Sequence, residues 1–417
     1  MGLFTNRKSF IIKSLALTVT ALMVNTAQAA DNSEIQQLRN EVQELKALLQ
    51  QQQQQVRLVE SKVDSAPASS AAAGLKSKSG ADINIYGFVR GDANYIIEGA
   101  DDDFNKVSSS KGEAEDKLRA TAKTTRIGLD FNTPVADAKV GGKVEVDFAS
   151  GDNSKAENLR IRHAYLTYNN WLFGQTTSNF LSSHAPEMID FATNIGGGTN
   201  RQPQVRYTYS LAPTTKLLVA AEEGNNSATG GTIKYSLPAL TGKLTQSYAG
   251  GNGNASARVL VENYKDSAVG KDKTGWGVAA GTDFKVNDQL KLFADASYVV
   301  GNSNDLYGSN SAYTVVNGDI EQNEFTAVQV GGTYKFLPNL RSTLAYGAQF
   351  ADDSTDYAKA KATADANEKV QQAWLNVIYS PVKPLDLGVE YINGKRDTFG
   401  GKSYKDNRVG LMAKYNF

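Results

Sequence analysis

The sequence contains no cysteine and only two histidines, His163 and His184. The absence of cysteine excludes disulfide frameworks, thiolate metal sites and cysteine nucleophiles, and two histidines leave little from which to build a metal centre. The 44 basic and 44 acidic side chains cancel, which argues against a basic nucleic-acid-binding protein. Proline is also scarce, with 9 residues against 37 glycines and 19 tyrosines in a chain of 417. This composition favours an all-β protein.

Long apolar runs are missing as well. The stretch Ile11–Val24 is too short for a transmembrane helix, which needs about 20 apolar residues. It follows basic residues and precedes Ala27-Gln28-Ala29, whose small side chains suit the recognition positions of a signal peptidase. We therefore expect residues 1–29 to be a signal peptide rather than a membrane anchor, and the mature chain to be exported. Because no later stretch resembles a transmembrane helix, a membrane location would require a β-barrel.

A heptad pattern follows the signal peptide. Over residues 30–63, apolar side chains recur at the a and d positions, with Gln52 as the polar exception, and this predicts a coiled-coil oligomerisation stalk. The glutamine run 50–55 has low complexity, but the apolar register resumes in phase at Val56, which favours one continuous helix. The residue types at a and d lean towards a two-stranded coil. Residues 64–81, rich in alanine, serine and glycine, are typical of a flexible linker.

From Asp82 to Phe417, segments of about ten residues alternate between apolar and polar side chains. Short and long connections also alternate, which predicts an all-β transmembrane barrel of 16 antiparallel strands over residues 82–417, although a soluble sandwich would alternate too. Short turns are predicted at 132–137, 169–170, 212–215, 238–242, 287–288, 337–339 and 380–384, and long loops at 98–118, 151–157, 178–203, 223–231, 251–273, 301–324, 352–369 and 397–404.

Proline placement fits this assignment, because a proline inside a closed barrel would remove a ladder hydrogen bond. All prolines of the body fall in predicted turns or loops: Pro134, Pro186, Pro203, Pro213, Pro238, Pro338, Pro381 and Pro384. Residues 257–264 (ARVLVENY) also alternate as a strand would. Counting them would give an odd number of strands, so we assign them to the fifth loop.

The arginines within the predicted strands all fall on the polar parity and should face the lumen, since an arginine at the bilayer midplane costs about 2–4 kcal/mol. They are Arg90, Arg126, Arg160, Arg162, Arg206, Arg341, Arg396 and Arg408; Arg201 ends the third loop, and Glu187 and Asp190 are its two acids. Bases on one wall opposite acids on an infolded loop would create a transverse field that orients charged solutes. The alternative is that these are ordinary solvated lumen residues without substrate preference.

Bases outnumber acids on the predicted lumen parity, which favours small anions. The arginine fork matches carboxylates in a bidentate way, so small dicarboxylates are reasonable solutes. In the predicted loops, by contrast, acids outnumber bases. An acidic rim is consistent with divalent cations that bridge the loops to surface lipopolysaccharide.

The stretches Arg160–Phe180 (RIRHAYLTYNNWLFGQTTSNF) and Ala185–Phe191 (APEMIDF) resemble the DcaP-like family of outer-membrane porins, and the chain is similar to that family from end to end. The resemblance implies a homotrimer of sixteen-stranded barrels in the outer membrane, with the stalk in the periplasm and the third loop (178–203) folded inside each pore. It also implies diffusive uptake of small anions, dicarboxylates among them, with Arg160, Arg162 and the acids of the third loop lining the pore.

Other functions fit the sequence less well. An enzyme would need a nucleophile, a base and an orienting group held together. His163 shares its parity with Leu159 and Ile161 and should face lipid or a subunit interface, and no spacing near His184 singles out a triad. We expect no enzyme activity, no cofactor, no metal and no nucleic-acid partner. The remaining alternative is a structural protein whose coiled coil tethers a non-selective barrel to the cell wall.

Overall fold

The computed structural model describes residues 75–78, 80–150 and 158–417. The predicted signal peptide, the coiled coil and most of the linker, residues 1–74, lie outside the described residues, as does the predicted loop at 151–157. Among the described residues, no helix is both long and apolar enough to cross a membrane.

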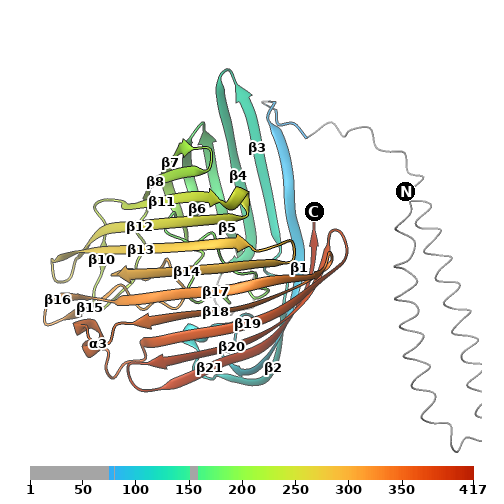
Figure 1. Cartoon of the computed structure of the whole chain (residues 1–417). Coiled ribbons are helices and arrows are strands. Elements are labelled where there is room, and N and C mark those ends of the chain that lie inside the picture. Colours follow the sequence, from blue (N-terminus) through green and yellow to red (C-terminus); the bar gives the residue numbers. More distant parts are fainter. Residues whose placement is uncertain (1–74, 79, 151–157) are drawn as a thin grey trace, which may run out of the picture. The chain divides into compact units, whose positions relative to one another are not determined.

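The body of the chain is a closed antiparallel barrel (Figure 1). Its main sheet holds 18 strand segments, and β21 pairs with β1 to close the ring. The segments are β1 (Asp82–Gly99), β2 (Ala114–Thr121), β3 (Arg126–Val135), β4 (Ala138–Ser150), β5 (Asn158–Tyr168), β6 (Trp171–Thr177), β7 (Arg201–Ala212), β8 (Thr215–Glu222), β10 (Ile233–Lys234), β11 (Ala239–Tyr248), β12 (Gly253–Asp266), β13 (Asp272–Lys285), β14 (Leu290–Val300), β17 (Glu324–Leu337), β18 (Leu340–Ala351), β19 (Asn367–Val382), β20 (Leu385–Thr398) and β21 (Ser403–Asn416).

Two of the barrel strands are interrupted. β2 and β3 both pair with β1, and β10 and β11 both pair with β12, so each couple forms one strand. The 18 segments therefore make 16 strands, which confirms the predicted sixteen-stranded antiparallel barrel. A small second sheet joins β9 (Ala228–Thr229), β15 (Tyr313–Val316) and β16 (Asp319–Gln322), and α3 (Asp356–Ala360) is a short helix in the seventh loop.

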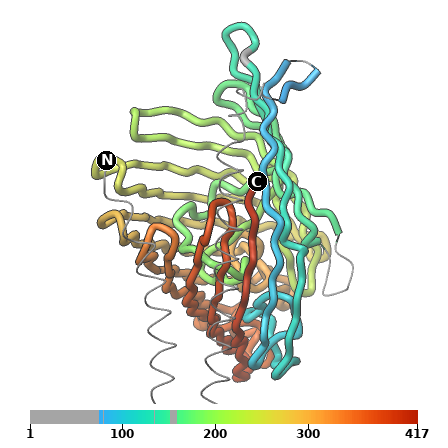
Figure 2. Tube along the Cα trace, turned by 90° about the vertical axis from the view of Figure 1, so that its right-hand side faces the viewer, coloured from blue at the N-terminus to red at the C-terminus, as the bar shows by residue number. Residues whose placement is uncertain are grey.

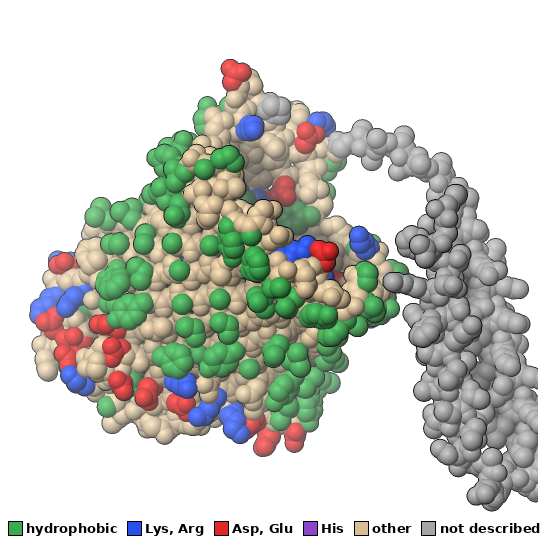
Figure 3. Space-filling view, viewed as in Figure 1, with side chains coloured by type: hydrophobic (Ala, Val, Ile, Leu, Met, Phe, Trp, Pro, Cys, Tyr) green, Lys and Arg blue, Asp and Glu red, His purple; other side chains and the backbone are tan. Residues whose placement is uncertain are grey.

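Side chains alternate between the outer wall and the lumen along each strand. On β20, for example, Leu387, Val389 and Tyr391 are exposed, whereas Glu390 and Ile392 are buried. Figure 3 shows the result on one face, where hydrophobic side chains cover the wall between two charged ends. This alternation suits a strand that has lipid on one side and a polar lumen on the other.

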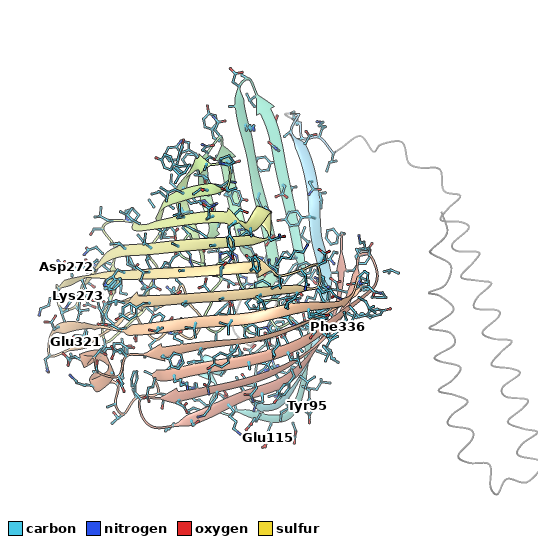
Figure 4. The ribbon with its side chains drawn as sticks, viewed as in Figure 1. Tyr95, Glu115, Asp272, Lys273, Glu321 and Phe336 are labelled. Atoms are coloured by element: carbon cyan, nitrogen blue, oxygen red, sulfur yellow. The ribbon has the colours of Figure 1, made fainter. Side chains whose placement is uncertain are left out.

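The two ends of the barrel differ. The short turns gather at one end, where the exposed Phe336 lies, and the β3–β4 hairpin projects there (Figures 1, 2 and 4). The long loops gather at the other end, where Asp272, Lys273 and Glu321 lie (Figure 4). The molecule is hollowed at the short-turn end, and charged side chains are visible inside the hollow (Figure 3).

The strand count is right, but two predicted boundaries are wrong. The predicted turn at 238–242 falls at the start of β11, and the real turn contains the short helix η2 (Ala249–Gly251). Residues 257–264, which the sequence predicts to lie in a loop, belong to β12, a barrel strand that pairs with both β11 and β13. The prediction divides the strand formed by β10 and β11 into two and omits β12. The two errors cancel, so the predicted number of strands is still 16.

Three prolines lie inside strands, contrary to the prediction: Pro134 in β3, Pro203 in β7 and Pro381 in β19. Pro134 is next to last in its strand, and Pro381 lies at a register shift with β20. The carbonyl oxygen of Pro203 accepts a hydrogen bond from the backbone N–H of Glu223, one residue beyond the end of β8. Because the N–H and C=O of a residue in an antiparallel sheet point to the same neighbour, the bond that Pro203 cannot donate is the one to Glu223, so the loss falls at the very end of the β7–β8 ladder.

Candidate pore constriction

Three long loops fold into the barrel and narrow it. The third loop, residues 178–200, follows β6 and buries Phe180 and Leu181 almost completely. The first loop, residues 100–113, and the sixth loop, residues 301–312, also contribute buried residues, among them Asn105 and Asp305. The sequence predicted an inward course only for the third loop.

Basic side chains of the wall anchor the first half of the third loop. The Nζ of Lys243 donates to the carbonyl oxygen of Leu181 at 3.0 Å, and a guanidinium nitrogen of Arg258 donates to that of Phe180 at 3.2 Å. Arg258 also forms an ion pair with Asp295 at 2.7 Å. Sequence reasoning missed both bases, because the misplaced turn at 238–242 and the omitted strand removed them from the predicted lumen.

The second half of the third loop holds its two acids, and both are engaged. The carboxylate of Glu187 accepts two hydrogen bonds from Arg341 at 2.7 and 2.8 Å. Asp190 is 2% exposed and accepts from the backbone N–H groups of Asn105 at 2.7 Å and Ala192 at 2.9 Å. Burial raises the pKa of Asp190 to about 6. Glu187 thus neutralises Arg341, and Asp190 ties the third loop to the first.

Several lumen arginines are buried and hold loops in place. Arg90, one of the predicted pore-lining residues, binds Asp92 and the carbonyl oxygen of Ile189 in the third loop. Arg408 forms an ion pair with Asp406 at 2.8 Å and donates to two carbonyl oxygens of the first loop at 3.1 Å. Guanidinium groups that are buried and paired in this way hold the loops against the wall.

A cavity of about 520 Å³ lies between the infolded loops and the wall of β3 and β5. Its basic lining residues are Lys106, Lys123, Arg126, Arg160, Arg162 and Arg201, and Asp102 is the one acid among its described lining residues. Phe191 and Tyr307 contribute aromatic surface. The structure therefore brings together four of the predicted arginines, from β3, β5 and the start of β7, and places Arg90, Arg206 and Arg341 elsewhere.

Four of the six bases have a carboxylate partner. Arg160 pairs with Asp147 at 2.7 Å, and Arg162 pairs with Asp147 and Glu145 at 2.8 Å each. The two lysines, which the sequence did not single out, pair with acids of the first loop at 2.6 Å: Lys106 with Asp102 and Lys123 with Asp103. Six bases thus stand against four carboxylates.

Arg126 and Arg201 are the two bases without a close ion pair. The Nε of Arg126 lies 3.5 Å from Glu145, which is long for a charge-assisted hydrogen bond. Arg201 has no ion pair with any acid in the described part of the chain. The Nε atoms of both are buried without a hydrogen-bond partner there. Unsatisfied buried donors of this kind are uncommon, and they leave two positive charges uncompensated beside the cavity.

A β-bulge shapes the same wall. The register between β4 and β5 shifts where Glu145 pairs with His163, and Arg162 is the extra residue. His163 therefore turns inward: its Nδ1 lies 2.9 Å from the hydroxyl of Thr176, and its Nε2 lies 3.9 Å from Glu145. The prediction that His163 faces lipid or a subunit interface is wrong, because simple alternation does not continue through a bulge.

His184 occupies an arrangement that has the connectivity of a serine hydrolase triad. Its Nδ1 lies 2.7 Å from Asp283 and its Nε2 lies 3.0 Å from the hydroxyl of Ser256. However, Ser256 is 5% exposed and does not line the cavity of about 430 Å³ beside His184. The three side chains attach the third loop to β12 and β13. Among the described residues, no cluster of three or more metal-binding side chains occurs.

Another cavity, of about 380 Å³, lies at the short-turn side of the third loop. Its charged lining residues are Lys285, Lys291, Lys335 and Arg341 against Glu187 and Asp288. Ala185 of the third loop lines both this cavity and the larger one. The loop therefore separates two spaces in which bases outnumber acids.

A closed barrel with an apolar outer band, a charged lumen and an infolded third loop defines a porin, a channel of the outer membrane. The family model of the DcaP outer membrane protein matches residues 17–417. The chain belongs to the DcaP outer membrane protein family. It is 75% identical to the outer membrane channel DcaP of Acinetobacter baumannii in its crystal structure, with a TM-score of 0.81 over 83% of this chain and 100% of that chain.

More distant porins share the fold. The anion-selective porin from Comamonas acidovorans is 13% identical, with a TM-score of 0.55 over 81% of this chain and 100% of that one. Salmonella typhi OmpF in complex with daunomycin is 14% identical, with a TM-score of 0.53 over 82% of this chain and 99% of that one. A search of the curated proteins gave no match.

Proposed function

We propose that this channel gives small anions, dicarboxylates among them, a passive diffusive route across the outer membrane. The observation that carries the proposal is the cavity of about 520 Å³ whose lining includes six bases, of which Arg126 and Arg201 lack a carboxylate partner at hydrogen-bond distance. A dianion would compensate both charges. The planar guanidinium fork matches carboxylate geometry, and a low-dielectric wall strengthens the attraction.

The route past the third loop supports the same direction of selectivity. An anion would pass from the cavity of about 520 Å³, beside Ala185, to the cavity of about 380 Å³ with its three lysines and Arg341. Bases outnumber acids on both sides of the loop, so the potential along this path favours anions throughout.

The solute class can be tested with the purified channel in a planar bilayer under a gradient of potassium succinate. We expect a reversal potential that shows succinate passing in preference to potassium. The variant Arg126→Gln/Arg201→Gln should reduce that preference without loss of the open channel. No response of the wild-type channel to the succinate gradient would contradict the dicarboxylate part of the proposal.

We further propose that the channel is a homotrimer with a periplasmic coiled-coil stalk over residues 30–63. The heptad pattern supports the coiled coil, and the family resemblance supports three copies rather than the two that the residue types at a and d favour. The acids at the long-loop end suit cation-bridged contact with lipopolysaccharide. Deletion of residues 31–64 separates this view from the structural alternative. Loss of envelope integrity with unchanged conductance and selectivity would favour a tether.

A further inference from the structure

The third loop lies against a glycine in the middle of a wall strand. Gly347 of β18 faces the lumen, because it pairs directly with Gln329 of β17 and Gln372 of β19, whose side chains are both buried there. Gly347 does not have a positive φ. Since any residue can adopt the extended backbone of a strand, the conformation of β18 does not itself require glycine at this position.

The backbone of the loop occupies the space where a side chain of residue 347 would lie. A Cβ on Gly347 would overlap the carbonyl oxygen of Ile195. The same oxygen accepts a hydrogen bond from the amide of Gln329 at 3.2 Å. The next loop residue, Gly196, has a φ of 84° and lies equally close to the carbonyl oxygen of Val328 on β17. The loop and the wall therefore meet backbone to backbone on two neighbouring strands.

A second glycine, Gly388 of β20, accommodates the same loop in a different way. A Cβ there would lie 2.5 Å from the Cδ1 of Ile189. Ile189 is buried and packs against Ile378 and Met412 of the wall, and its backbone N–H donates to Glu390 at 2.8 Å. At Gly388 the close atom is thus the end of a side chain, whereas at Gly347 it belongs to the backbone.

These contacts determine how far the third loop extends into the lumen. Phe191, Ala192 and Asn194, from the same stretch of the loop, line the cavity of about 520 Å³, which has β3 and β5 as its opposite wall. β18 and β20 are each hydrogen-bonded to a strand on both sides. A methyl group added to either glycine would therefore displace the loop rather than the wall, and the displaced loop would enter the cavity.

We propose that Gly347 and Gly388 are positioning residues that set the largest solute the channel admits. They let the third loop lie directly on the wall, and the space that this leaves between the loop and the strands β3 and β5 is the width of the path. Closely packed interiors respond even to one added carbon, so alanine at either position narrows the path. The inference rests on the proposed path through this cavity but not on its preference for anions.

The size limit can be tested by the swelling of liposomes that contain the full-length channel, in a series of neutral polyols and sugars from erythritol to glucose. Gly347→Ala should lower the rates for the larger solutes at least about twofold relative to erythritol, because the loop backbone has to move. Gly91→Ala is the control, since Gly91 is exposed on β1 and an added Cβ has no atom within 4 Å. Wild-type relative rates in Gly347→Ala, a wider channel, or an equal fall in Gly91→Ala would overturn the proposal.

Compensating substitutions separate positioning from a general loss of structure, and they keep the test open if Gly347→Ala does not fold. Gly388→Ala should also narrow the channel, and Gly388→Ala/Ile189→Val should restore the wild-type rates, because valine lacks the Cδ1 that the new methyl group meets. Gly347→Ala/Ile195→Val should restore nothing, since the overlapping atom is a backbone oxygen.

The opposite pattern, with no restoration by Ile189→Val or with restoration by Ile195→Val, would overturn the proposal. Because the solutes in the swelling series are neutral, its result does not depend on the sign of the charge in the lumen. A wild-type channel without anion preference in a planar bilayer would refute the proposed function, and the swelling series would still decide whether the two glycines set the size limit.

Discussion

Two groups of arginines share the lumen, and they differ in what their guanidinium groups bind. Arg90, Arg258, Arg396 and Arg408 are at most 2% exposed and bind both carboxylates and the carbonyl oxygens of infolded loops. Arg126, Arg160, Arg162 and Arg201 line an open cavity instead, and two of them have no close ion pair. The first group maintains the loop fold, and we propose that the second group acts on solutes.

The comparison shows what alternation along a strand can and cannot reveal. It assigns each side chain to lipid or lumen, because an arginine on the lipid side is costly. The role of a lumen arginine depends on which loop folds over it. The contacts between loops and wall join residues far apart in sequence, as between Arg408 and the carbonyl oxygens of Ala100 and Asp102.

The largest difference between the groups should be in stability. Arg408→Met leaves Asp406 fully buried without its ion pair, which should lower the free energy of unfolding by about 3–5 kcal/mol. Arg160→Met should cost no more than about 1 kcal/mol, because its side chain is 42% exposed. The temperature at which the folded barrel unfolds on semi-denaturing gels measures both. Equal losses would remove the distinction between the groups.

Two buried acids of the infolded loops should make the stability of the channel depend on pH. Burial raises the pKa of Asp190 and of Asp305 to about 6, above the ordinary value of 3.8. Between these values the folded channel holds protons that the unfolded chain releases, so stability falls as pH rises from about 4 to 6. Above pH 6, each of these ionised acids lowers the free energy of unfolding by on the order of 2–3 kcal/mol.

Unfolding temperatures at pH 5 and pH 7 check this effect. Wild-type channels should unfold at the lower temperature at pH 7, and Asp190→Asn should reduce the difference between the two values. A wild-type channel that is more stable at pH 7 than at pH 5 would show that these loop acids do not carry the effect.

Selectivity should depend on the cavity group. Arg126→Gln/Arg201→Gln removes the two uncompensated charges and should lower the ratio of anion to cation permeability on the order of tenfold, which corresponds to about 1.4 kcal/mol. Unfolding temperature should change little, because neither side chain has a close ion pair to lose. Reversal potentials in potassium chloride gradients give the ratio, and an unchanged ratio would refute the assignment.

The smallest effect should come from removing a neutral pair. Glu145→Gln/Arg162→Gln deletes the ion pair of 2.8 Å without changing the net charge of the cavity. The permeability ratio should stay within about twofold of wild type, since the summed field is nearly unchanged. A tenfold drop here would mean that the paired arginines, rather than Arg126 and Arg201, govern selectivity.

Alternation and connection lengths in the sequence were sufficient to predict the barrel and its sixteen strands. The prediction of strand boundaries failed where residue types typical of a turn lie within or beside a strand. Pro238 and Gly242 suggested a turn, but Pro238 lies between β10 and β11, where the strand is interrupted. The true turn uses Ala249 and Gly250, which have φ of 50° and 64°. A glycine-rich run followed by a full-length strand was the available signal, and the omitted β12 concealed Arg258.

The constriction was only partly predictable. Parity and the family resemblance identified Arg126, Arg160 and Arg162 as lumen residues, and proximity to the third loop identified Arg201. The inward course of the first and sixth loops, which brings Lys106 and Tyr307 to the cavity, depends on contacts between distant residues that no local pattern encodes. The bulge that turns His163 inward did leave a signal, because the exposed positions change phase from Leu159 and Ile161 to Leu166 and Tyr168.

One measurement tests the central claim most directly: the reversal potential of the purified wild-type channel in a planar bilayer under a potassium chloride gradient at neutral pH. Six bases against four carboxylates around the cavity predict a potential whose sign shows chloride passing in preference to potassium. A potential of zero, or one whose sign shows preference for potassium, would contradict it.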